Sequence, residues 1–249
     1  MGKSYTTKCK TLKKDLSSAF SQLGWNNHRS ILIEIMSIIT KATYNHTDVE
    51  IISSENIYKG FVQVEKVEFR HRLFNQKDYT PVISRELIGR KEAAGALLYD
   101  DQQQKFALIE QFRVGALNDQ DSPWQLEIIA GVLDGDESPE TCIIRECQEE
   151  SGCVINDPQH LFTFYPSAGA CNEIFHLYSA ETQLPEQGGI FGVEGEGENI
   201  QLHIIEYTAV ESLLKSTRLR NAPVIMALQW LYQHIKGRSN VLGVRHDES

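Results

Sequence analysis

GVLDGDESPETCIIRECQEESGC, residues 131–153, predicts a loop that leads into a helix. Ser138 can cap the first turn of that helix, and Pro139 suits a position where a missing N–H costs nothing. Gly152 suits the left-handed conformation that ends many helices. We therefore expect a helix between Ser138 and Gly152, preceded by a loop rich in Gly and Asp.

Three carboxylates lie on one face of this predicted helix. Glu146, Glu149 and Glu150 are spaced i, i+3 and i+4, which places them within one turn of each other. Carboxylates this close repel one another unless they are well solvated or share a divalent cation, and their hard oxygens suit Mg²⁺ or Mn²⁺. For an acidic helix considered by itself, a solvated face is the alternative.

The stretch also resembles the signature of the Nudix (MutT-like) hydrolases, G-x5-E-x7-R-E-U-x-E-E-x-G-U, where U is apolar. Cysteine stands at both apolar positions and behaves there as a small hydrophobe. The matching residues are Gly131, Glu137, Arg145, Glu146, Cys147, Glu149, Glu150, Gly152 and Cys153. The resemblance implies a mixed α/β fold, a Nudix α/β/α sandwich, that hydrolyses the diphosphate of a nucleoside diphosphate linked to another group.

The same resemblance implies roles for individual residues. Mg²⁺, or Mn²⁺ as the alternative, would be held by four groups: the carbonyl of Ala130 and the carboxylates of Glu146, Glu150 and Glu198. Glu149 and Arg145 would take part in catalysis. Arg145 and Glu137 could instead pair with each other, which would hold the loop against the helix.

The resemblance extends over roughly residues 48–236 and is strongest to the bacterial ADP-ribose pyrophosphatases. The segments that carry it are 58–61, 69–75, 84–86, 109–113, 124–131 and 227–231. Members of that family are homodimers that exchange an N-terminal sheet domain, so that both chains build each site. Carried over by position, the substrate-binding residues would be Phe61, Arg85, Glu86, Arg113 and Glu173.

Phe61 would stack on the adenine, and the guanidinium groups of Arg85 and Arg113 fit phosphate oxygens. For Arg85 considered by itself, a surface salt bridge with Glu86 is the alternative.

In this family the catalytic base lies on a mobile loop after the signature. The matching segment is residues 194–200, EGEGENI, in which Glu196 falls at the position of the base and Glu198 at a metal-contacting position. The flanking glycines suit a lid that closes over the substrate. A Gly/Glu loop without function is the alternative.

One loop departs from the family pattern. The family usually has S-P-G-G-x-S-E after the strand that follows the signature, whereas this chain has SAGACNE at residues 167–173. Ser167, Gly169 and Glu173 remain, but the marker proline is Ala168. Because this loop helps to shape the pocket beyond the diphosphate, the change bears on the choice of sugar more than on the reaction.

Composition narrows the remaining possibilities. The chain of 249 residues has a net charge of -10, with 24 Lys and Arg against 34 Asp and Glu, so we expect no general binding to nucleic acid or to an anionic membrane. No apolar run approaches the ~18 residues of a membrane helix. The five cysteines show no CxxC spacing, which favours reduced thiols in the cytoplasm.

The pattern along the chain predicts four parts. Residues 1–47 form an N-terminal extension, expected to be helical, and 48–90 a small antiparallel β domain. Residues 91–236 form the catalytic domain, and 237–249 a tail. Strands are expected at 93–99, 106–109, 161–165, 173–179 and 200–207, with a loop at 188–197 and closing helices at 209–215 and 222–235.

Together these observations predict a Mg²⁺-dependent enzyme that hydrolyses ADP-ribose to AMP and ribose 5-phosphate. The same chemistry on another nucleoside diphosphate sugar, such as ADP-glucose or GDP-mannose, is the first alternative. A non-catalytic sensor that binds ADP-ribose is the second, and the intact set of acids weighs against it.

Overall fold

The computed structural model describes residues 41–74, 78–192, 195 and 197–241. The helix predicted near the start of the chain and the end of the predicted tail lie outside these residues. Within them, the contacts divide the chain into two compact units. One unit contains residues 41–54 and 67–85, and the other contains 55–66 and 86–241.

Residues 49–89 form a three-stranded sheet, as the sequence predicts. Its strands are β1 (Val49–Lys59), β2 (Gln63–His71) and β3 (Ile83–Gly89), in the order β1-β2-β3. Only residues 60–62 join β1 to β2, and a connection this short is possible only between antiparallel strands. The ion pair of Arg70 with Glu50 ties the two strands together at 2.6 Å.

The larger sheet has eight strands and is mixed. Its main path runs β10-β11-β5-β4-β9-β8, with β6 paired to β5 and β7 paired to β4. The β4–β9 pair is parallel, and the other pairs are antiparallel. The strands are β4 (Ala93–Asp100), β5 (Lys105–Phe112), β6 (Trp124–Glu127), β7 (Ile129–Val132), β8 (Gln159–Phe164), β9 (Phe175–Glu181), β10 (Ile190–Phe191) and β11 (Ile200–Glu206).

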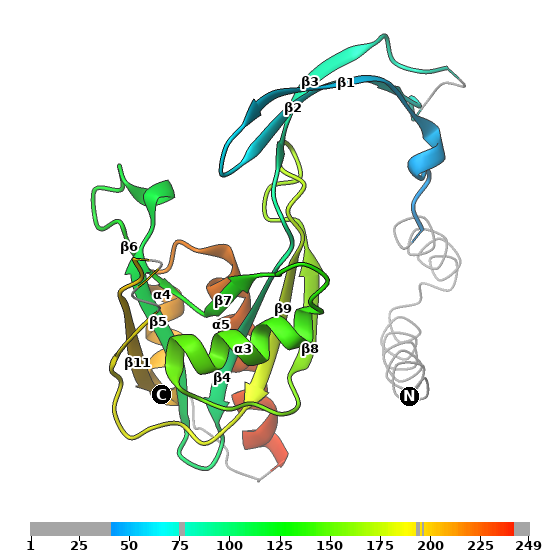
Figure 1. Cartoon of the computed structure of the whole chain (residues 1–249). Coiled ribbons are helices and arrows are strands. Elements are labelled where there is room, and N and C mark those ends of the chain that lie inside the picture. The colour runs from blue at the N-terminus through cyan, green and yellow to red at the C-terminus, as the bar shows by residue number, and fades with distance from the viewer. Residues whose placement is uncertain (1–40, 75–77, 193–194, 196, 242–249) are drawn as a thin grey trace, which may run out of the picture. The chain divides into compact units, whose positions relative to one another are not determined.

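Helices cover both faces of this sheet (Figure 1). On one face α3 (Pro139–Ser151) packs against the sheet through Cys142, Ile143 and Cys147. On the other face lie α4 (Val210–Lys215) and α5 (Ala222–Val241), which contribute Val210, Val224 and Leu228 to the second core. Alternate residues of β4 enter the two cores, which is why all eight of its residues are buried. The predicted α/β/α sandwich is thus confirmed.

The ends of α3 are formed by the residues expected from the sequence. The Ser138 hydroxyl accepts a hydrogen bond from the Thr141 amide at 3.2 Å, and Pro139 occupies the first turn. Gly152 ends the helix with a φ of 69°, in the left-handed region that glycine adopts at little cost.

The segment 188–197, predicted to be entirely loop, contains a short strand. Ile190 and Phe191 pair with Gln201 and Ile200 of β11. Two residues are too few to show the alternation that identifies a strand in a sequence. Their extended conformation depends on the pairing with β11. Short 3-10 turns lie at His46–Asp48, Val114–Ala116 and Tyr207–Ala209. Among the described residues no helix is long and apolar enough to span a membrane.

Candidate active site

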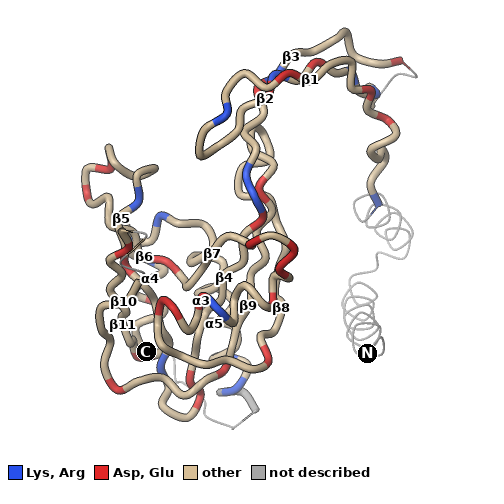
Figure 2. Tube along the Cα trace, in the orientation of Figure 1, with Lys and Arg blue, Asp and Glu red and all other residues tan. Residues whose placement is uncertain are grey.

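Arg145 forms ion pairs with three carboxylates of the stretch quoted above. Its guanidinium donates to Glu137 at 3.2 and 3.1 Å, to Glu146 at 2.7 Å and to Glu149 at 3.0 Å. Charges of both signs therefore lie close together along α3 and the loop before it (Figure 2). The hydrogen bonds to Glu137 raise the pKa of Arg145 and lower that of Glu137. This is the pairing that the sequence offered as the alternative to a catalytic role for Arg145.

Glu150 is the buried carboxylate of the site. It is 3% exposed, and it accepts a hydrogen bond from the Ala130 amide of β7 at 3.1 Å. Burial, together with the negative charges of Glu146 and Glu198, raises its pKa to about 8, although the hydrogen bond from Ala130 acts in the opposite direction. A carboxylate in this position is stabilised by any positive charge that reaches it.

Glu146 lies directly over Gly131, the first residue of the quoted stretch. A Cβ atom built on Gly131 would overlap Glu146 Oε1, so any larger residue there would displace the carboxylate. Burial raises the pKa of Glu146 even though Arg145 acts in the opposite direction. The glycine thus allows the loop to approach the acidic face of α3.

Arg113, at the end of β5, is held by a residue that the sequence analysis did not single out. Its Nε donates to both carboxylate oxygens of Glu127 at 3.1 and 3.0 Å, and its Nη2 donates to Oε2 at 2.7 Å. Although burial alone would lower the pKa of Arg113, the bond to Glu127 and the charges of Glu150 and Glu198 raise it. Arg113 therefore lies within the electrostatic reach of the acidic cluster.

Glu127 receives a second donor from far along the chain. The Nδ2 amide of Asn221, at the start of α5, donates to its Oε1 at 2.9 Å. The sequence did carry one signal for Glu127, which is an acid within the mostly apolar segment 124–131. An acid buried in such a segment needs a partner for its charge. Nothing in the sequence identified Asn221 as one of its partners.

The residues present fit a divalent cation by their chemistry. Glu150 is buried and Glu146 partly buried, burial and the charge of Glu146 raise the pKa of Glu150, and hard oxygens are the donors that Mg²⁺ prefers. Within the part of the chain that the structure describes, no three acidic, imidazole or thiolate side chains converge as a complete metal site. Mg²⁺ commonly fills its shell with waters and substrate phosphates, so a partial protein donor set is compatible with it.

The acids predicted on the loop after the signature are only partly described. Glu196, the predicted base, lies outside the described residues. Glu198 is described, and its charge acts on Glu146, Glu150 and Arg113. The structure therefore brings Glu198 to the cluster formed by the predicted metal ligands.

The remaining predicted substrate residues lie elsewhere in the fold. Phe61 is at the turn between β1 and β2 and is 99% exposed. Arg85 and Glu86 are exposed on β3, where Arg85 donates to the Ser84 carbonyl at 2.8 Å instead of pairing with Glu86. Glu173 pairs with Arg90 at 3.4 Å.

The loop that departs from the family pattern is fastened to the end of β3. The Ile88 amide donates to the Ala170 carbonyl at 2.7 Å, and the Asn172 amide donates to the Ile88 carbonyl at 3.2 Å. The Asn172 side chain in turn accepts from the Arg90 amide at 2.9 Å. Residues 167–173 are therefore held by backbone bonds and do not depend on the proline that the family usually has there.

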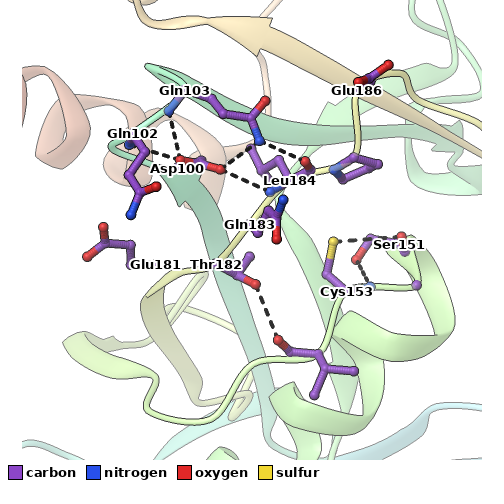
Figure 3. A pocket seen from close by; sticks show the side chains of 13 residues that line it. Asp100, Gln102, Gln103, Ser151, Cys153, Glu181, Thr182, Gln183, Leu184 and Glu186 are labelled. Carbon is purple, nitrogen blue, oxygen red and sulfur yellow. Dashed lines mark hydrogen bonds between the residues drawn. The ribbon is translucent and has the colours of Figure 1, made fainter.

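A separate cavity of about 1000 Å³ lies at the carboxyl end of α3 (Figure 3). Asp100 lines it and accepts hydrogen bonds from the amides of Gln102, Gln103 and Leu184, at 2.9, 2.9 and 3.2 Å. Since these bonds satisfy the carboxylate, Asp100 serves to hold the loop around Leu184. The acids of the signature do not line this cavity.

Comparison with known proteins gives a consistent result. A family model for the NUDIX domain matches residues 89–228. The chain is 33% identical to an ADP-ribose pyrophosphatase of Escherichia coli (strain K12) over 198 residues, which is 80% of this chain and 94% of that protein. A GDP-mannose pyrophosphatase of Yersinia pestis (strain Pestoides F) is also 33% identical, over 75% of this chain and 92% of that protein.

Among solved structures, one described as an ADP compounds hydrolase superposes with a TM-score of 0.59. It is 21% identical, and the match covers 79% of this chain and 98% of that one, so this likeness concerns the fold alone. The family model and the curated relatives both cover most of the fold that carries the acidic helix. The chain therefore belongs to the Nudix hydrolase family, in which it is similar to the ADP-ribose pyrophosphatases.

Proposed function

We propose that this protein is a nucleotide-sugar pyrophosphatase that hydrolyses ADP-ribose to AMP and ribose 5-phosphate and requires Mg²⁺. The observation that carries the proposal is the buried carboxylate of Glu150, which lies beside Glu146 and within reach of the Arg113 charge. An acidic cluster that needs a cation, next to a guanidinium that suits phosphate, fits a diphosphate held through a metal ion.

Each part of the site has a task in this reaction. Glu146, Glu150, Glu198 and the Ala130 carbonyl would hold Mg²⁺, and Mn²⁺ is an acceptable substitute. When bound, the cation would neutralise charge on the phosphoryl oxygens and lower the pKa of a water molecule. Arg113 would orient the diphosphate, and Arg145 would fix the loop against α3 through Glu137.

Proton transfer would fall to acids beside the metal ligands. We assign the base to Glu196, with Glu149 as the other acid near the reacting water. Glu149 is the most exposed of the three carboxylates bonded to Arg145, with a side chain 38% exposed, so it can reach a bound water without leaving its partner. Replacing each by Gln distinguishes them, since loss of the base lowers kcat far more than loss of a neighbouring acid.

The substrate would also be recognised outside the signature. Phe61 would stack on the adenine, Arg85 and Glu86 would bind polar groups of the substrate, and Glu173 would contact the group beyond the diphosphate. Strand β1 and the turn that follows it expose apolar side chains at Ile51, Ile52, Ile57, Tyr58 and Phe61. These exposed groups support a homodimer in which the N-terminal sheet is exchanged. We further infer a cytoplasmic protein, which fits the free thiols of Cys142, Cys147, Cys153 and Cys171.

The test is product release from ADP-ribose, ADP-glucose and GDP-mannose, with Mg²⁺ and with a chelator. We expect turnover that depends on Mg²⁺ and is fastest with ADP-ribose. Preference for GDP-mannose would retain the mechanism and overturn the substrate. This second candidate is favoured by the relatives named GDP-mannose pyrophosphatase and by the altered loop at 167–173. Tight binding of ADP-ribose without turnover would show a sensor instead of an enzyme.

A further inference from the structure

The connection between α4 and α5 holds the segment that carries Arg113. This connection, residues 216–221, is called here the α4–α5 loop. Its side chains donate hydrogen bonds to three points of the segment 113–127: Arg218 to the Trp124 carbonyl at 2.6 Å, Arg220 to the Asp119 carboxylate at 2.9 Å, and Asn221 to Glu127 at 2.9 Å. Arg220 also pairs with Asp121.

These contacts are polar and directional, and they add to the packing of Leu219 in the core. A cavity of about 90 Å³ remains between the α4–α5 loop and the segment 113–127, lined by Asp119, Asp121, Ser122, Gln125, Thr217, Arg218 and Arg220. Because side chains do not fill this space, the hydrogen bonds add to the pairing of β6 with β5 in positioning the segment.

Asn221 occupies the decisive position in this arrangement. Glu127 is 5% exposed, and its two oxygens are shared between the Arg113 guanidinium and the Asn221 amide. The amide donor restrains Oε1, so the carboxylate plane faces the guanidinium and the fork stays aligned. Without the amide, the buried carboxylate could rotate, and Arg113 would rotate with it.

A role for Asn221 only in starting α5 is the alternative explanation. Asn221 immediately precedes Ala222, the first residue of α5, and its carbonyl accepts from the Ile225 amide at 3.3 Å. A capping asparagine uses its side-chain oxygen for amides of the first turn. Here the hydrogen bond of the side chain is made by its nitrogen, and it goes to Glu127.

We propose that Asn221 is a positioning residue for substrate binding, acting through Glu127 to hold the Arg113 guanidinium in the orientation that receives the diphosphate. The proposal rests on the function proposed above for Arg113. Asn221 itself touches no reacting group, and its contribution is made through a buried carboxylate contributed by β6.

The first experiment is a double-mutant cycle. Asn221→Ala should lower kcat/KM for the preferred nucleotide sugar about 10-fold, mainly through a higher KM, which is the size of one hydrogen bond to a charged group. In an Arg113→Lys background the same change should cost less than about twofold, because lysine has no fork for Glu127 to align. Equal losses in both backgrounds, or no loss in either, would overturn the proposal.

The control is Asn156→Ala, which removes an exposed asparagine from the same unit. It should leave kcat/KM unchanged. Asn221→Ser covers the case in which the alanine variant does not fold, since serine suits the start of a helix but is too short to replace the amide donor to Glu127. We expect Asn221→Ser to raise KM about as much as Asn221→Ala.

The second experiment needs no turnover, so it separates this proposal from the proposed reaction. The Nε–Hε signal of Arg113, assigned by its loss in Arg113→Lys, is measured by NMR in protein without substrate. The bonds to Glu127 should slow its exchange with water, and Asn221→Ala should shift the signal and speed its exchange while Asn156→Ala does neither. An unchanged Arg113 signal in Asn221→Ala would refute the proposal even if ADP-ribose were hydrolysed, and a changed one would support it even if ADP-ribose were not a substrate.

Discussion

Arg145 and Arg113 are both held by carboxylates, but the two regions are built in different ways. Arg145 and its partners Glu137, Glu146 and Glu149 all come from the loop and helix of one continuous stretch. Arg113 follows β5, its partner Glu127 ends β6, and Asn221 precedes α5. The first region is a local motif, whereas the second exists only once distant parts of the chain have folded together.

This difference predicts different consequences of substitution. Helical spacing and a capped first turn bring the partners of Arg145 together. Substitutions in this region should therefore affect both the loop and the proposed metal-binding acids. The partners of Arg113 are connected by the sheet and by the α4–α5 loop. Changes there should therefore affect how a substrate is held more than whether the fold forms.

The largest expected effect is in the local motif. Glu150→Gln should lower kcat by on the order of 10³-fold, because a lost metal ligand removes several kcal/mol of charge stabilisation in the transition state. The fold should survive, since burial already raises the pKa of Glu150 to about 8 and a neutral amide suits the same place. Steady-state kinetics with a Mg²⁺ titration measures the loss.

The matched control for that variant is Glu140→Gln, which changes an exposed acid in the first turn of the same helix. It should keep activity close to that of the wild type. If Glu150→Gln retained comparable activity, Glu150 would not be a metal ligand.

Substitution of Arg113 in the second region should have a smaller effect than Glu150→Gln, and that effect should fall mainly on substrate binding. Arg113→Lys keeps the positive charge but loses the fork that faces Glu127, and we expect kcat/KM to fall about 10-fold to 100-fold. The thermal unfolding midpoint should change little, because a charge remains beside the buried carboxylate. A large fall in that midpoint with unchanged KM would mean that Arg113 serves the fold and not the substrate.

The sequence predicted the first region well because its information is local. The spacing of Glu146, Glu149 and Glu150 and the residues that cap α3 are all contained in the quoted stretch, and the structure forms the helix where they require it. Alternation and turn residues also located most strands. The two-residue strand β10 was not predicted, because its conformation depends on its pairing with β11.

The second region could not be completed from the sequence. Arg113 was identified through resemblance, but Asn221 lies far from it along the chain and has no distinctive neighbours. An asparagine before a helix ordinarily indicates a cap, so its bond to Glu127 became evident only in the folded chain. Residues that act through tertiary contacts leave no periodic pattern to read.

A third substitution tests the claim that the Arg145 region is the one that supports the fold. Arg145→Lys can satisfy one carboxylate at a time, and we expect the free energy of unfolding to fall by about 1–2 kcal/mol. The loss is modest because the Arg145 side chain is 32% exposed and water screens its bonds. Urea unfolding without added metal measures it. A loss no larger than that of Arg113→Lys would remove the distinction between the two regions.

The last expected effect concerns pH and the cation, and it depends on Glu150. A free glutamate in the unfolded chain has a pKa of about 4.3, whereas burial and neighbouring charges raise the pKa of Glu150 in the fold to about 8. The folded state therefore binds this proton more tightly, and its contribution to stability is lost as the pH rises towards about 8. In a chelator, the unfolding midpoint of the wild type should fall relative to that of Glu150→Gln by on the order of ten degrees over this range.

Mg²⁺ should reverse that difference, because a cation bound to the carboxylate replaces the proton as its compensating charge. The wild type should regain the lost degrees at high pH when Mg²⁺ is added, and Glu150→Gln should not. If the unfolding midpoints of the two proteins changed in parallel with pH in chelator, Glu150 would not be the acid whose pKa is raised in the fold. A gain of equal size in both proteins would place the cation elsewhere. Either result would leave the Arg113 region as the part of the site best supported by its own contacts, since its bonds to Glu127 and Asn221 need no metal to hold them.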